Sequence, residues 1–101
     1  MENRILIKEH RGERVWLIEL VSGLRLRLCL QCSGQVLVKG KTGRYQDGDS
    51  VWYSCYEDDL YRDHCLNNRM YAKTDRLVAE EIQFIRNCCH ALRKQYPDWW
   101  A

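Results

Sequence analysis

The chain has no apolar run long enough for a membrane span or a signal segment, and its net charge is only +2 over 101 residues. A helix that crosses a bilayer needs about 20 consecutive apolar residues. A net charge this small gives no general attraction to a polyanion. We therefore expect a cytoplasmic protein with no membrane partner, in which the six cysteines are reduced or bind metal.

The sequence also lacks the short motifs that commonly mark enzyme active sites. It contains no GxSxG, no HExxH and no phosphate-binding glycine loop. The fragment GKTGR at 40–44 lacks the glycine spacing before it and a helix after it, so we interpret it as a basic turn. His64 and Cys65 are neighbours, and adjacent side chains on a helix point about 100° apart, which disfavours a catalytic dyad. We predict no enzymatic activity, although a cysteine-dependent activity stays open.

The composition suits one small globular domain. Apolar residues make up 46% and charged residues 30% of the chain, which is neither a disordered nor a fibrous composition. There is no internal repeat, linker or low-complexity segment. We expect a single domain over 1–101, with a β-meander in 1–56 and a helical part with its tail in 57–101.

Alternating hydrophobicity predicts strands in the first part of the chain. The clearest case is LRLRLCLQ at 24–31, where every second residue is leucine. Its two faces are Leu24, Leu26, Leu28 and Leu30, expected inward, and Arg25, Arg27, Cys29 and Gln31, expected outward. The predicted strands are 4–9, 14–21, 24–31, 35–39 and 50–56. Glycine-containing turns separate the first four, including a two-residue loop at Ser22–Gly23, so we expect an antiparallel order.

The second part of the chain has helical patterns. Residues 57–66 begin with acids, which suits the start of a short helix. Apolar residues recur at helical spacing over 74–96: Val78, Ile82, Ile85, Cys89, Leu92 and Tyr96. Thr74 or Asp75 is the expected cap, and Pro97 the expected end. We expect Trp99 and Trp100 to fold back onto the sheet, since exposed terminal indoles would form an apolar patch. The predicted fold class is α+β.

Four cysteines raise the alternative of one structural zinc ion. Cys29-x-x-Cys32 precedes a glycine turn, as in half of a zinc knuckle. The second half would come from Cys55 with Cys65 or His64, but these lack the usual ligand spacing. Cysteine also packs as a small hydrophobe, which explains Cys89 on the helical stripe and Cys55 among aromatic residues. We favour packing and no cofactor, with zinc as the alternative.

A basic segment suggests a nucleic-acid surface. Residues 23–46 contain no acid, and their basic residues are Arg25, Arg27, Lys39, Lys41 and Arg44. On an outward sheet face these cations would contact phosphates, and Tyr45 would stack on a base. Cations also keep a half-buried sheet soluble, so direct nucleic-acid binding is the alternative hypothesis.

An acidic and aromatic segment follows it and predicts a protein interface. The residues that we expect to contact a partner are Trp52, Tyr53, Tyr56, Glu57, Asp58, Asp59 and Tyr61. Tyrosine and tryptophan are common interface anchors, and the carboxylates would suit a basic groove. The competing interpretation is a sheet edge with its aromatics covered and its acids in water.

Our leading hypothesis is a small, non-enzymatic intracellular binding protein that acts by protein–protein contact. A narrower version is an accessory protein, of the kind that phages and mobile elements encode, that inhibits or modulates a host nucleic-acid enzyme. This version comes from what small domains of this size commonly do and from no particular residue. The alternative is a DNA-binding or other nucleic-acid-binding module that uses the basic sheet face with or without zinc.

Overall fold

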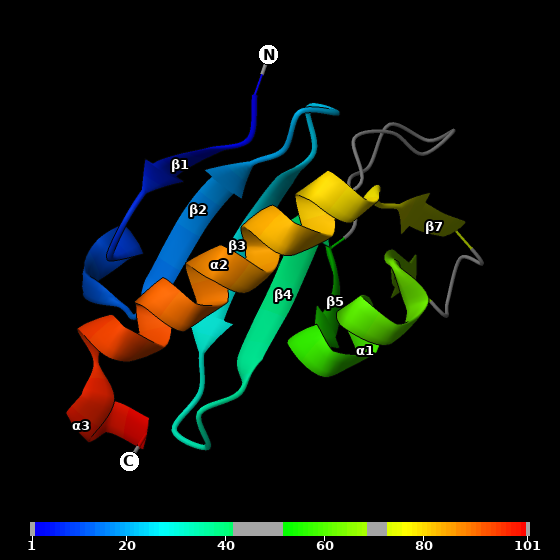
Figure 1. Ribbon diagram of the computed structural model, residues 1–101. Coiled ribbons are helices and arrows are strands. Elements are labelled where there is room, and N and C mark those ends of the chain that lie inside the picture. Colours follow the sequence, from blue (N-terminus) through cyan, green and yellow to red (C-terminus); the bar gives the residue numbers. More distant parts are fainter. Residues whose placement is uncertain (1, 42–51, 69–72, 101) are drawn as a thin grey trace.

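A computed structural model describes residues 2–41, 52–68 and 73–100 and confirms the α+β fold class (Figure 1). Five antiparallel strands form the main sheet in chain order. They are β1 (Arg4–Ile7), β2 (Val15–Glu19), β3 (Arg25–Leu30), β4 (Val36–Lys41) and β5 (Trp52–Tyr56). A single 3-10 turn, η1 (His10–Gly12), links the first two. The sheet is therefore a simple meander in which each strand pairs with the next.

The leucine alternation of β3 sets the two faces of the sheet. Leu26, Leu28 and Leu30 are buried, while Arg25 is exposed and Cys29 is half-buried. Partners across antiparallel strands lie on the same face, so the register extends each face over neighbouring strands. One row of the inner face is Trp16, Leu28, Val38 and Cys55. This inner face forms the floor of the hydrophobic core.

Two three-residue loops join the central strands. Leu20 N–H donates to Leu24 O at 2.8 Å, and Gln31 N–H donates to Gln35 O at 2.9 Å. Each loop ends in a glycine with positive φ, 92° at Gly23 and 90° at Gly34. Such loops combine a type I turn with a left-handed residue, which glycine adopts without steric cost. The loop after β2 therefore has three residues instead of the predicted two.

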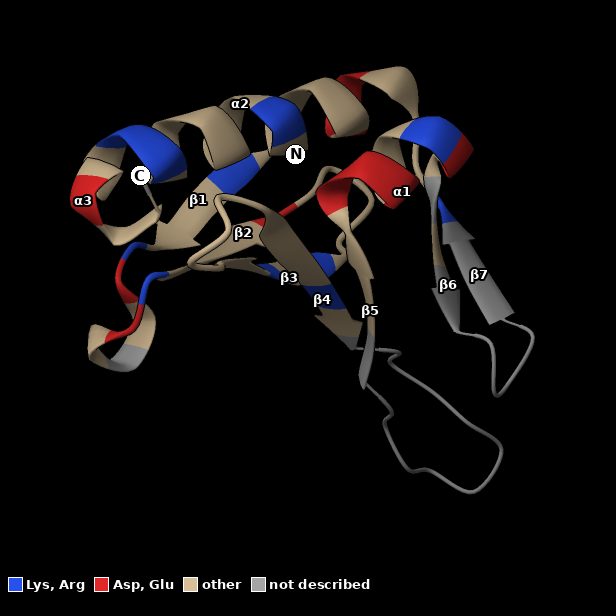
Figure 2. Cartoon of the chain, turned by 90° about the horizontal axis from the view of Figure 1, so that it is seen from below, with Lys and Arg blue, Asp and Glu red and all other residues tan. Residues whose placement is uncertain are grey.

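The helices all lie on one side of the sheet (Figure 2). They are α1 (Glu57–Asp63), α2 (Ala79–Gln95) and α3 (Pro97–Trp100). The apolar residues that α2 buries are Ile82, Ile85, Cys88, Cys89 and Leu92, and Glu81 is buried with them. Val78, predicted on the same stripe, is instead 57% exposed. In the described part of the chain, no helix combines the length and the apolar character that crossing a membrane requires.

The structure corrects the region between the two main helices. α1 ends at Asp63 instead of residue 66, because His64 adopts a left-handed φ of 55° and turns the chain. A separate antiparallel hairpin follows, formed by β6 (Cys65–Asn68) and β7 (Lys73–Arg76). The long helix therefore begins at Ala79, and the N-cap is Val78 instead of Thr74 or Asp75. The Glu81 carboxylate accepts the Val78 N–H at 3.1 Å, which satisfies a donor at the helix start.

The C-terminal tryptophans turn back toward the loop between β3 and β4, but both stay partly exposed, Trp99 at 42% and Trp100 at 36%. Pro97 ends α2 and begins α3, which reverses toward the loop between β3 and β4. Trp99 Nε1 donates to Leu30 O at 3.4 Å, and Trp100 Nε1 donates to Arg93 O at 3.0 Å. The Trp100 ring lies directly over Gly34, where an added Cβ would come within 2.7 Å of Cε3. Gly34 is thus required both by its φ and by this ring.

A matched pair of glycine substitutions tests the Trp100 contact. Gly23→Ala and Gly34→Ala impose a similar left-handed strain, about 1–2 kcal/mol, because their φ values nearly coincide. Only Gly34→Ala also meets a ring, so we expect it to lose a further 1–3 kcal/mol or so of unfolding free energy. Urea denaturation measures both losses. In a Trp100→Ala background the excess should disappear, and equal losses in the wild-type background would contradict the contact.

Candidate functional site

The face of the main sheet opposite the helices, which we call the outer face, has a row of apolar residues. Cross-strand pairing aligns Val15 with Cys29, Cys29 with Leu37, and Leu37 with Tyr56. We call these four residues the apolar row. The row runs from Val15, which is 7% exposed, to Tyr56, which is 43% exposed. None of the helices α1, α2 and α3 lies over this face, whereas η1 lies on this side of the sheet, next to β2 (Figure 2).

The next row of the outer face contains two opposed cations. Arg27 pairs directly with Lys39 across β3 and β4, and Leu17 and Ser54 continue the row. Like charges opposite one another in a sheet are destabilising. Both cations lie close enough to Cys29 to act against the rise of its pKa that burial causes. The outer face thus combines apolar side chains with a local positive charge.

The remaining predicted cations differ in their surroundings. Arg25 forms an ion pair with Glu19 at 2.9 Å, and Arg4 forms another with the same carboxylate at 2.7 Å. Hydrogen bonds from Arg25 and Arg4 hold the pKa of Glu19 below its usual value. The Lys41 side chain, together with Arg44, falls outside the described residues. The five predicted basic residues are therefore not a uniform patch, since Arg25 is already paired.

The start of α1 places two carboxylates next to Tyr56. Tyr56 is the N-cap of the helix, and Asp58 and Asp59 lie exposed in its first turn. Arg62 pairs with Asp59 at 3.1 Å and with Asp63 at 3.3 Å, and all three side chains are more than half exposed. We call Tyr56, Asp58 and Asp59 the acidic turn. It adjoins the exposed end of the apolar row, because Tyr56 belongs to both.

Glu57 and Tyr61, predicted to contact a partner, instead make internal contacts. Glu57 is 3% exposed and forms an ion pair with Arg93 of α2. Its oxygens also accept the Tyr61 hydroxyl at 2.7 Å and the Val36 N–H at 3.3 Å. The Tyr61 ring lies 4.2 Å from the Arg86 guanidinium, and burial raises the pKa of its hydroxyl. The expected surface position of Glu57 is thus corrected, since its charge is needed inside the fold.

The backbone of β5 includes two more of the predicted contact residues. Trp52 pairs with Lys41, and Tyr53 pairs with Gly40. Their side chains, like Tyr45, fall outside the described residues. Of the seven predicted contact residues, the described side chains at the surface are therefore Tyr56, Asp58 and Asp59.

The sheet separates two of the four predicted zinc ligands. Cys29 lies on the outer face, whereas Cys55 pairs with the buried Val38 and packs against the core from the inner face. Cys32 is exposed at the first position of the loop after β3, and the Cys65 side chain lies outside the described residues. Over the residues that the structure describes, no three potential ligands come together. Cys29 and Cys55 therefore lie on opposite faces of one sheet, and the four-cysteine zinc site stays a prediction.

Two residues of the apolar row, Val15 and Leu37, were not among the predicted functional residues. Both lie within predicted strands. The alternation of apolar residues within 14–21 and 35–39 is the sequence signal that could have identified them.

No family model, curated protein or solved structure matches this chain.

Substitution of Glu57 tests whether this residue is structural. Glu57→Gln leaves Arg93 without its counter-ion in a site where both side chains are at most one-fifth exposed. We expect a loss of about 3 kcal/mol in unfolding free energy, measured by urea denaturation. Asp58→Asn, one position along and exposed, should change stability by less than about 0.5 kcal/mol.

A double substitution separates the ion pair from a general packing effect. Glu57→Gln combined with Arg93→Met removes both charges, so the loss should be smaller than the sum of the two single losses. Strictly additive losses would contradict a direct interaction between Glu57 and Arg93.

Thiol labelling tests the surroundings of the cysteines. Burial raises the pKa of Cys88 to about 11 and of Cys89 to about 12. At pH 8, about one in a thousand Cys88 thiols and about one in ten thousand Cys89 thiols would be the reactive thiolate. We expect iodoacetamide to modify exposed Cys32 in the native protein, and Cys88 and Cys89 only after unfolding, as read by peptide mass spectrometry. A chelator that accelerates labelling at Cys29 and Cys32 would instead support the zinc hypothesis.

Proposed function

We propose that this chain is a non-enzymatic intracellular binding protein that contacts another protein through the outer face and the acidic turn. The observation that carries the proposal is the position of Tyr56. This side chain is 43% exposed, ends the apolar row and begins the acidic turn. A partner that covers Tyr56 would therefore meet apolar surface on one side and carboxylates on the other.

The chemistry of the apolar row favours a protein partner. A sheet with one face in water usually alternates apolar and polar residues, so that its outer face is polar. Here the outer face includes Leu17 and Leu37, and also Ile7, which is 44% exposed. Clustered apolar residues at a surface commonly mark protein contacts, and tyrosine is frequent among residues that dominate binding energy.

The acidic turn suggests a more specific partner. Asp58 and Asp59 lie exposed in consecutive positions, and exposed carboxylates complement a basic groove. Proteins that process nucleic acids have such grooves for phosphates. In the narrower form of the proposal, the chain inhibits or modulates a nucleic-acid enzyme of a host, as phage and mobile-element accessory proteins do. If so, duplex DNA should compete with the chain for its partner.

Direct nucleic-acid binding is a second candidate, and one observation favours it. Arg27 and Lys39 face each other across β3 and β4, so two cations lie next to each other on the outer face. Neighbouring cations on a sheet face suit contacts with phosphates. Binding of this kind weakens steeply as salt rises, because each neutralised phosphate releases counter-ions.

Substitutions on the proposed surface test the protein contact. Tyr56→Ala and Leu37→Lys should each weaken capture of a specific partner from an extract of the cells that encode the chain, by at least about tenfold, or 1.4 kcal/mol. Asp58→Lys should weaken it too if the partner is basic. The measurement is quantitative mass spectrometry of what each variant retains, followed by titration of the purified partner.

His90→Ala is the matched control, because His90 is exposed on α2 on the other side of the sheet. It should retain the partner at the wild-type level. If Tyr56→Ala and Leu37→Lys also retain it, the proposed surface is wrong. Salt-sensitive binding to random DNA that Lys39→Glu abolishes would favour the second candidate instead.

A further inference from the structure

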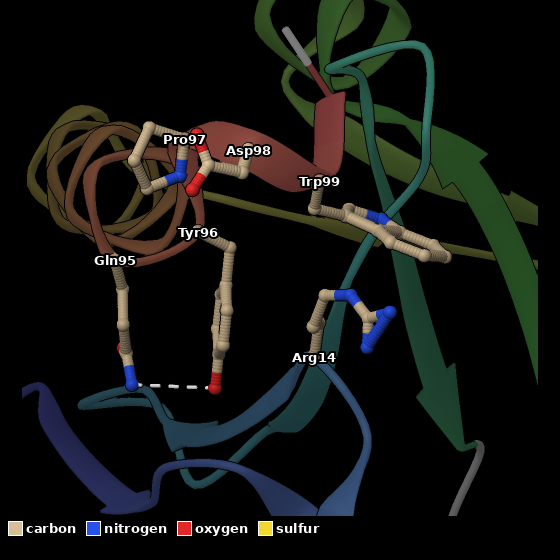
Figure 3. Close-up of a pocket in the computed structure, with 6 residues that line it drawn as sticks. All are labelled: Arg14, Gln95, Tyr96, Pro97, Asp98 and Trp99. Atoms are coloured by element: carbon tan, nitrogen blue, oxygen red, sulfur yellow. Dashed lines mark hydrogen bonds between the residues drawn. The ribbon is translucent and has the colours of Figure 1, made fainter.

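We draw no further inference here: the strongest candidate, the open aromatic hollow at the C-terminal turn where the Arg14 guanidinium stacks on the Trp99 ring beside Tyr96 (Figure 3), carries none because nothing in the structure shows what covers it.

Discussion

Arg93 connects three separate elements of the structure. Its guanidinium forms the ion pair with Glu57 and donates Nε–H to Gly34 O at 2.6 Å. Its own carbonyl accepts from Trp100 Nε1. One residue in the last turns of α2 therefore holds the start of α1, the loop between β3 and β4, and the reversed segment α3. Remove it, and three elements lose their common attachment.

A buried ion pair is stable only if the remaining polar atoms around it are also satisfied, because both charges have left water. The Glu57 carboxylate meets that condition through Tyr61 and the Val36 N–H. Arg93 meets it through the loop carbonyl. The same contacts fix where α1 begins, so the exposed acidic turn has a rigid base. Glu57 is buried beneath the acidic turn, while its neighbours Asp58 and Asp59 are exposed.

Elements with a strong hydrophobic period could be predicted from the sequence, and elements without one could not. Leucine alternation in 24–31 indicated the two faces of the third strand, and the stripe over 78–92 indicated the buried face of α2, because burial imposes those periods. The hairpin β6–β7 escaped detection, since CLNN and KTDR contain no aromatic residue and only one β-branched residue, Thr74. Glu57 was misplaced for a related reason: an acid in a first helical turn has the same local pattern whether it meets water or an arginine distant in sequence. Only the tertiary fold, which brings Arg93 to it, separates those cases.

The proposed surface at Tyr56 depends on the end of α2. Tyr56 is placed through Glu57 and Arg93, and the Arg93 carbonyl also holds α3, which follows α2 directly (Figure 1). A substitution at Arg93 would disturb this surface and stability together, so a loss of binding there would not identify a contact. Side chains at the surface, with no part in this network, are the ones whose loss can be assigned to a contact. That is why Asp58 is informative and Glu57 is not, although they are neighbours in the sequence.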